Sequence, residues 1–111
     1  MKTIAYTVAV ILIAATLSPG RTPLAADAKA GGDVFSKKCA SCHGAQGEGK
    51  ESVAKMLKAD MKPLGSKDVQ AKSDADLAKV VKEGSGKMKP VSGVTDKDIQ
   101  DVVAFLRTLK K

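Results

Sequence analysis

The chain has 111 residues, of which 43% are hydrophobic and 28% are charged. This length and balance suit one small domain and argue against two independently folded units. Two Phe, one Tyr and no Trp are present, so the large side chains that usually fill a small core are scarce, and another group should supply bulk. The formal net charge of +7 favours acidic partners. It does not indicate nucleic acid binding, because aromatic side chains for base stacking are nearly absent.

The N-terminal segment has the profile of an export signal. After Lys2, residues 3–17 carry no charge and are mostly apolar, which is typical of a secretory signal peptide. The run is shorter than the about 20 apolar residues that a membrane-spanning helix needs. We therefore predict a signal peptide at residues 1–26, a mature domain at residues 27–111, and export to the periplasm or an equivalent compartment.

The cleavage position has two candidates. Small residues stand at Ala25 and Ala26, and a small-x-small pattern ends at Ala28. The sequence does not decide between cleavage after Ala26 and cleavage after Ala28. Removing residues 1–26 takes away two of the 19 basic residues and none of the 12 acids, so the mature chain stays basic.

Four short helices are expected in the mature chain. The first runs between Gly31 and His43, with a common side formed by Val34, Phe35, Lys38 and Cys42. The second is indicated by Ser52 as N-cap and by apolar residues at helical spacing, which are Val53, Met56 and Leu57. Because Met56 falls on that stripe, we expect it to belong to the core.

The third and fourth helices have clearer boundaries. Ser73 followed by Asp76 predicts an N-terminal cap, and Gly84 a C-terminal stop, for a helix with an apolar stripe of Leu77, Val80 and Val81. Thr95 caps the last helix, whose apolar positions are Ile99, Val102, Val103, Leu106 and Leu109. No convincing period-2 strand is found, so the predicted fold class is all-α.

Both cysteines and the single histidine fall within five consecutive residues, Cys39-Ala40-Ser41-Cys42-His43. Two thiols one helical turn apart can form thioether bonds with the two vinyl groups of haem, and the following histidine can then bind the iron. Three alternatives fit less well. A disulfide would close too small a loop to stabilise the fold much. A thioredoxin-like dithiol requires a preceding strand, which is not found. A structural zinc site requires about four protein ligands. The pentad therefore predicts one covalently attached haem c, with Cys39 and Cys42 as thioether residues and His43 as an axial ligand.

The second axial ligand follows by elimination. No second His and no other Cys exist, so Met is the main candidate. Met61 and Met88 both stand in a Met-Lys-Pro tripeptide. Met88 follows a glycine-rich segment that can approach a porphyrin closely, whereas Met61 is only 18 residues from His43 and would have to reach the opposite haem face. We predict Met88 as the ligand and keep Met61 as the alternative.

The mature chain resembles the small class I cytochromes c, similar to cytochrome c6 and bacterial single-haem cytochromes, from about Gly31 to Leu109. The resemblance rests on Gly31, Phe35, Cys39, Cys42, His43 and Gly44, on Gly86-Lys87-Met88-Lys89-Pro90, and on the segment Asp101 to Leu106. It implies the cytochrome c fold, with about four short helices and long loops wrapped around one covalently attached haem. It also implies that the first and last helices cross, through contacts of Gly31 and Phe35 with Val102 and Phe105.

Two positions depart from the family pattern. Lys89 separates Met88 from Pro90, where family members usually have Met followed directly by Pro. Residues 44–52 contain no Pro, whereas many members have one there whose carbonyl holds the ligand histidine. The hydrogen-bond acceptor for His43 is therefore left open.

A haem with His and Met ligands has no open site, so we expect one-electron transfer and not enzyme catalysis. We predict a soluble, monomeric shuttle between exported or membrane redox partners that have acidic docking surfaces. The lysines that flank the haem-binding segments should form the positive docking face, and they are Lys37, Lys38, Lys87 and Lys89. The alternatives are a five-coordinate haem that senses or binds a gas or reduces peroxide, and an oxidase or reductase subunit tethered by residues 4–17.

Overall fold

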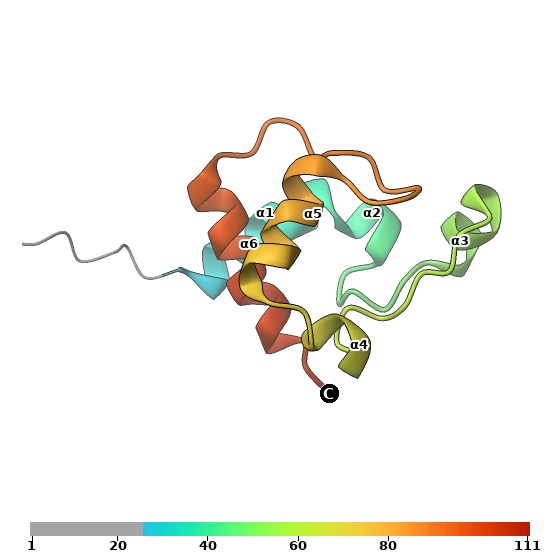
Figure 1. Cartoon of the computed structure of the whole chain (residues 1–111), viewed down its shortest axis with the longest axis horizontal. Coiled ribbons are helices and arrows are strands. Elements are labelled where there is room, and N and C mark those ends of the chain that lie inside the picture. The colour runs from blue at the N-terminus through green and yellow to red at the C-terminus, as the bar shows by residue number, and fades with distance from the viewer. Residues whose placement is uncertain (1–25) are drawn as a thin grey trace, which may run out of the picture.

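The computed structural model describes residues 26–111, so the expected signal peptide lies outside the described residues except for Ala26. This part of the chain forms six helices, shown in Figure 1: α1 (Ala28–Lys38), α2 (Ala40–His43), α3 (Glu51–Leu57), α4 (Lys67–Gln70), α5 (Asp74–Glu83) and α6 (Asp96–Thr108). Within residues 26–111 the one strand-like feature is a bridge between Ser85 and Met88, and the all-α prediction is confirmed. No helix in this range has the length and apolar character needed to cross a membrane.

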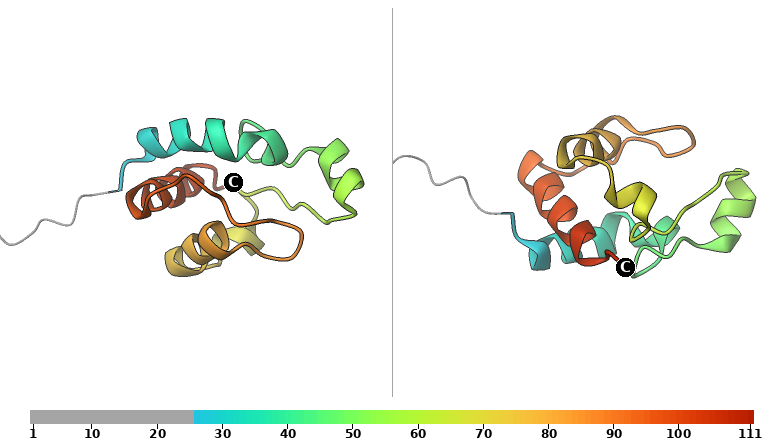
Figure 2. Two further views of the ribbon diagram at one scale, coloured as in Figure 1. Left: turned by 90° about the horizontal axis from the view of Figure 1, so that it is seen from above. Right: turned by 60° about the horizontal axis from the view of Figure 1, so that its bottom comes forward.

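Helices α1 and α6 make the main helix packing of the molecule. They lie side by side, α5 packs on α6, and α2 continues from the end of α1 (Figure 2). In all views α3 lies at the far end of the molecule from the start of α1, joined by two extended segments (Figures 1 and 2). The helical body is thus built from α1, α2, α5 and α6, with α3 set apart from it.

Helix α1 begins earlier than predicted. Asp27 is its N-cap, and one carboxylate oxygen accepts hydrogen bonds from the backbone N–H groups of Lys29 and Ala30, at 2.9 and 3.2 Å. These bonds satisfy donors that have no partner within the helix. The helix breaks at Cys39, so the single helix predicted between Gly31 and His43 is in fact two, α1 and α2.

The covered side of α1 also differs from the prediction. Gly31, Phe35 and Cys39 are buried, whereas Lys38 and Cys42, which the spacing places with Phe35, are exposed. Residues four apart share a helix face, so both sets are possible from spacing alone. The packing of α6 decides which edge of the helix is covered.

Helices α1 and α6 cross at Gly31. A Cβ atom on this residue would overlap the carbonyl oxygen of Asp101, so the two backbones touch where only glycine leaves room. One turn further along α1, the rings of Phe35 and Phe105 have centroids 5.1 Å apart and are inclined at 45°, a geometry that aromatic pairs favour. Val102 is buried in the same cluster as Phe35. The predicted crossing is confirmed.

The core extends from this crossing to the pentad. Its buried cluster consists of Phe35, Cys39, Val102 and Leu106, and Phe35 is only 1% exposed. Leu77 and Val81 of α5 and Ile99 and Val103 of α6 are buried as predicted. Because Cys39 is both a core residue and the first residue of the pentad, the core positions the pentad directly.

Helices α5 and α6 begin at the predicted caps. The Ser73 hydroxyl accepts a hydrogen bond from the backbone N–H of Asp76 at 3.1 Å, and Gly84 ends α5 with a φ of 80°. Thr95 and Asp98 form a reciprocal capping box at the start of α6. These caps involve residues three apart, which is why sequence alone predicts them.

Helix α3 differs from the prediction in its cap and in its burial. Lys50 precedes the helix without a side-chain cap bond and Ser52 lies inside it, so the predicted Ser52 cap is wrong. Met56 is 74% exposed, so the prediction that it belongs to the core is also wrong. In the described part of the chain no other helix packs extensively on α3, so Val53 and Leu57 of its apolar stripe are only half-buried and Met56 is exposed.

Helix α4 and the arginine that anchors it have no clear signal in the local sequence pattern. Arg107 of α6 donates hydrogen bonds to the carbonyl oxygens of Gln70 and Lys72 and to the carboxylate of Asp74, at 2.9, 2.7 and 2.8 Å. The Gln70 side chain donates to the carbonyl oxygen of Leu106 at 2.9 Å. These bonds tie the segment between α4 and α5 to α6. They join residues at least 33 apart, which local spacing does not reveal.

Candidate functional site

The pentad from Cys39 to His43 forms one helical turn, which includes α2. The backbone N–H groups of Cys42 and His43 both donate to the carbonyl oxygen of Cys39, at 3.2 and 3.0 Å. Residues three apart lie near one another on a helix surface, so this turn presents the two sulphurs together with the imidazole next to them. Cys39 is buried, Cys42 is exposed, and both are free thiols.

A loop folds back on the pentad and fixes its backbone. The N–H of Gly49 donates to the carbonyl oxygen of His43 at 2.6 Å, and the N–H of Lys50 donates to that of Cys42 at 3.2 Å. Gly44 ends α2 with a φ of 84°, and a Cβ atom there would overlap the carboxyl group of Glu48. Glycine is therefore required directly after the pentad, because the chain must turn sharply at that point.

The imidazole of His43 has the protonation preference of a metal ligand. Desolvation lowers its pKa below the ordinary 6.5, which favours the neutral ring that binds metals. Its Nδ1 atom is buried and has no hydrogen-bond partner in the described chain. A ligand histidine normally binds through one ring nitrogen and donates with the other. Within residues 26–111 no carbonyl oxygen takes the place of the family's proline carbonyl as the hydrogen-bond acceptor of His43 Nδ1.

The donor set fits covalently held haem. Burial, and secondly the charge of Cys42, raise the pKa of the Cys39 thiol, so Cys39 stays protonated. Two free thiols one turn apart can bond two vinyl groups, and the adjacent neutral imidazole can bind iron. Within residues 26–111 no group of three or more His, Cys, Asp or Glu side chains is placed to hold a metal ion.

Met88 is held in a tight turn directly after α5. Ser85 and Met88 exchange backbone hydrogen bonds, both of 2.9 Å, across Gly86 and Lys87. Gly84 has a φ of 80°, and a Cβ atom there would lie 2.5 Å from the carbonyl oxygen of Met88. The segment after α5 and the turn of α2 lie toward the same end of the molecule (Figures 1 and 2). The glycine-rich segment thus forms a fixed turn near the pentad's end of the fold.

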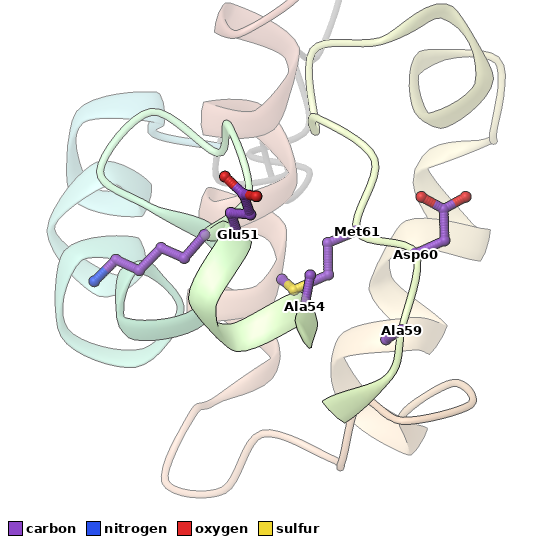
Figure 3. Close-up of a pocket in the computed structure, with 7 residues that line it drawn as sticks. Glu51, Ala54, Ala59, Asp60 and Met61 are labelled. Carbon is purple, nitrogen blue, oxygen red and sulfur yellow. The ribbon is translucent and has the colours of Figure 1, made fainter. Parts of the chain in front are cut away.

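Met61 lies in a different place, beside α3. Its side chain points toward Ala54 of α3 (Figure 3). It lines a hollow of about 250 Å³ together with Gly49 and Asp60, and this hollow includes neither the pentad nor Met88. The two methionines share a tripeptide motif, but the fold places them with different helices.

One charged residue in the helix crossing, Asp101, is not predicted from the sequence. Asp101 is 4% exposed and is the one buried charged side chain that residues 26–111 contain. Its Oδ1 atom accepts hydrogen bonds from the ammonium of Lys97 and, at 2.8 Å, from the backbone N–H of Asp27. These bonds, first that of Lys97 and then that of Asp27, hold the pKa of Asp101 below the ordinary 3.8. The i,i+4 spacing of Lys97 and Asp101 was its one signal in the sequence.

Comparison with known proteins gives consistent matches along most of the chain. The family model described as cytochrome C oxidase, cbb3-type, subunit III matches residues 26–106. Cytochrome c6 of Picosynechococcus sp. (strain ATCC 27264 / PCC 7002 / PR-6) is 35% identical over 103 residues, 89% of this chain and 87% of that protein. Cytochrome c-554(547) of Halothiobacillus neapolitanus is 34% identical over 78% of this chain and 100% of its own length. Among solved structures, the KustC0563 c-type cytochrome aligns with a TM-score of 0.62 at 25% identity, covering 73% of this chain and 98% of that one.

The chain belongs to the small class I c-type cytochromes, as its helix crossing, its pentad and these matches agree. Its all-α architecture is the cytochrome c fold, with six helices in the described residues where four were predicted. Its cofactor is covalently bound haem c, and its general role is electron transfer.

Proposed function

We propose that this cytochrome is an exported, monomeric one-electron carrier and not an enzyme. Haem c would supply the one-electron chemistry of its iron. Cys39 and Cys42 would hold the porphyrin by thioether bonds, and His43 would bind the iron from one side. The observation that carries the proposal is the turn of α2, which presents two free thiols and an imidazole that prefers the neutral form.

Met88 is the proposed iron ligand on the other side. Its turn is fixed by reciprocal backbone hydrogen bonds with Ser85 and lies toward the same end of the molecule as α2. Met61 instead packs beside α3, at a hollow that the pentad does not line. With His43 and Met88 both bound, the iron would have no open position, which suits electron transfer and not substrate chemistry.

Substitution of the methionines tests this ligation. Met88→Ala should abolish the thioether-to-iron charge-transfer band and lower the reduction potential, because a Met ligand raises it. Met61→Ala should keep both properties, and Met56→Ala is the matched control at an exposed position. The reverse pattern would assign the iron to Met61. An unchanged spectrum in all three variants would point to a five-coordinate haem, and gas binding or peroxide reduction would then be the function to measure.

We also propose that four lysines form a positive docking face for an acidic redox partner. Lys37, Lys38, Lys87 and Lys89 are exposed. None of them forms an ion pair with a carboxylate of the described chain, whereas the lysines of five other positions do. The ammonium of Lys38 lies beside Gly93, so the end of α1 and the segment after α5 share one surface. Uncompensated charge there would speed partner encounter.

Charge reversal tests the docking face. Lys87→Glu with Lys89→Glu should slow electron transfer with an acidic partner at low ionic strength, while the absorption spectrum stays the same. The matched control is Lys29→Glu with Lys72→Glu, which makes the same change in net charge at the opposite ends of α1 and α5. A helix of about ten residues separates these ends by roughly 15 Å, beyond the Debye length of about 8 Å at 0.15 M salt. Equal rates for the two double variants would place docking elsewhere on the surface.

A second candidate is a subunit of an oxidase or reductase, which the description of the matching family model favours. Such a subunit would be held at the membrane by an uncleaved segment at residues 4–17. The N-terminal sequence of the protein purified from the exporting cell separates the two functions. A carrier begins after the signal peptide, whereas a tethered subunit retains residues 4–17 and is recovered with membranes.

A further inference from the structure

Asp27 organises the start of α1 with its backbone as well as with its side chain. Its carboxylate accepts the cap bonds from Lys29 and Ala30, and its carbonyl oxygen accepts a bond of 2.9 Å from the N–H of Gly31. Its backbone nitrogen donates to Asp101 Oδ1 at 2.8 Å. One residue thus fixes the first turn of α1 and links it to α6, directly before the helix crossing.

The partner of this nitrogen is a buried carboxylate. Asp101 is 4% exposed, and a buried charge is stable in a protein only when it is paired and hydrogen-bonded. Lys97 supplies one cation, but its ammonium comes from the preceding turn of the same helix. The other donor is the backbone nitrogen of Asp27, which is a neutral amide as long as Ala26 precedes it.

We propose that the signal peptide is removed between Ala26 and Asp27, and that the α-ammonium so formed makes an ion pair with Asp101. A signal-peptidase type of protease would hydrolyse the peptide bond. The C–N bond between Ala26 and Asp27 breaks, the water oxygen becomes the second oxygen of the Ala26 carboxylate, and the two protons of the water pass to the Asp27 nitrogen, which becomes the ammonium. Processing would convert a neutral hydrogen bond into a charge-assisted one without moving either atom. The inference rests on the export proposed above.

The alternative cleavage after Ala28 would remove Asp27, the residue that connects the start of α1 to α6. It deletes Asp27, and with it the cap of α1, the carbonyl that Gly31 bonds and the second donor to Asp101. Small residues precede both positions, Ala25 and Ala26 before the first and the small-x-small set Ala26-Asp27-Ala28 before the second, and the sequence does not decide between them. A free ammonium at a helix start is also unfavourable because of the helix dipole. The carboxylates of Asp27 and Asp101 offset this repulsion only when the chain begins at Asp27.

The first test is the N-terminus of the protein that exporting cells make. The full chain is expressed in a host that attaches c-type haem, and the exported protein is analysed by intact mass and N-terminal sequencing. A chain that begins at Asp27 is expected. A chain that begins at Lys29, or one that keeps the leader, overturns the inference. The visible spectrum of the same sample reports the haem, so failure of the cleavage inference is distinguishable from failure of the proposed function.

The second test measures the ion pair by a double-mutant cycle. Haem-loaded chains that begin at Asp27 or at Thr22 are compared, each with Asp101 and with Asp101→Asn. Residues 22–26 carry no charge, so the longer chain keeps the amide at Asp27 and moves the ammonium five residues away. Asp101→Asn should reduce the folding equilibrium constant about fivefold more in the chain beginning at Asp27, because charged hydrogen bonds are roughly twice as strong as neutral ones. The extra loss should shrink in high salt. Equal losses in the two chains would overturn the ion pair.

Discussion

Two adjacent glycines show how much a single residue depends on its neighbour in space. In the sequence, Gly31 and Gly32 look alike, and both weaken the start of a helix. In the structure, Gly31 faces the backbone of Asp101, whereas Gly32 faces the side chain of Phe105. A Cβ atom on Gly32 would lie 3.2 Å from the Phe105 ring, and a half-buried side chain can shift where a backbone cannot. The two positions therefore have different tolerance for a methyl group.

This difference predicts unequal losses of stability for two alanine substitutions. Gly31→Ala gains up to about 1 kcal/mol of helix propensity, but it forces α1 and α6 apart, at a cost of about 1–3 kcal/mol or more. We expect the free energy of unfolding of the haem-loaded protein to fall by about 1–2 kcal/mol net, measured by urea denaturation. Gly32→Ala is the matched control and should change it by less than about 0.5 kcal/mol. Equal effects of the two substitutions would show that the close approach at Gly31 does not matter.

At the scale of whole elements, the two helices whose starts the sequence predicts both have side-chain caps, although α1 has one as well and begins earlier than predicted. Helices α5 and α6 carry side-chain caps, and both begin where the sequence places them. Helix α3 has no side-chain cap bond, and its predicted start is wrong. Helix α4 has only four residues and no side-chain cap, and its attachment to α6 comes from the distant Arg107. Caps next to a clear apolar stripe, as in α5 and α6, can be predicted from the sequence, whereas contacts across the fold cannot.

The capping box of α6 leads to a stability prediction. Thr95→Ala removes the hydroxyl that accepts the N–H of Asp98 at 3.1 Å, and we expect a loss of about 1 kcal/mol in the free energy of unfolding. Thr95→Ser keeps a hydroxyl acceptor at the same place and should lower the free energy of unfolding by only about 0.3 kcal/mol. Urea titrations followed by far-UV circular dichroism measure both. If serine and alanine are equally harmful, the hydroxyl bond is not the cause.

At the scale of the molecule, the protein core is small and ends where the haem is proposed to be attached. Residues 27–111 contain only Phe35 and Phe105 as aromatic residues, and they contact each other at the crossing of α1 and α6. The cluster they belong to ends at Cys39, one of the proposed attachment points for haem. A small domain with so little large apolar surface is marginal by itself. We infer that the porphyrin supplies the missing apolar volume.

Removal of the attachment points tests this dependence. The double substitution Cys39→Ala with Cys42→Ala should leave a largely unfolded or molten chain, because it prevents covalent attachment of the haem. Circular dichroism should show a reduced helical signal and a broad thermal transition. Gly32→Ala, handled in parallel, is a control for expression and export. A double variant that is fully helical and melts cooperatively would mean that the protein core is sufficient without haem.

The sequence by itself determined the chemistry of this protein. The two thiols and the histidine of the pentad lie within one helical turn, and the cap partners of α5 and α6 are three residues apart. Both features can therefore be recognised from a short stretch of sequence. Only the tertiary structure decided which side of α1 is buried, that Met56 is exposed, and that Asp27 reaches Asp101 across 74 residues. Those outcomes depend on which surfaces meet when α1 packs on α6. A residue's spacing along its own helix fixes its direction relative to its neighbours in sequence, but not whether another helix will cover it.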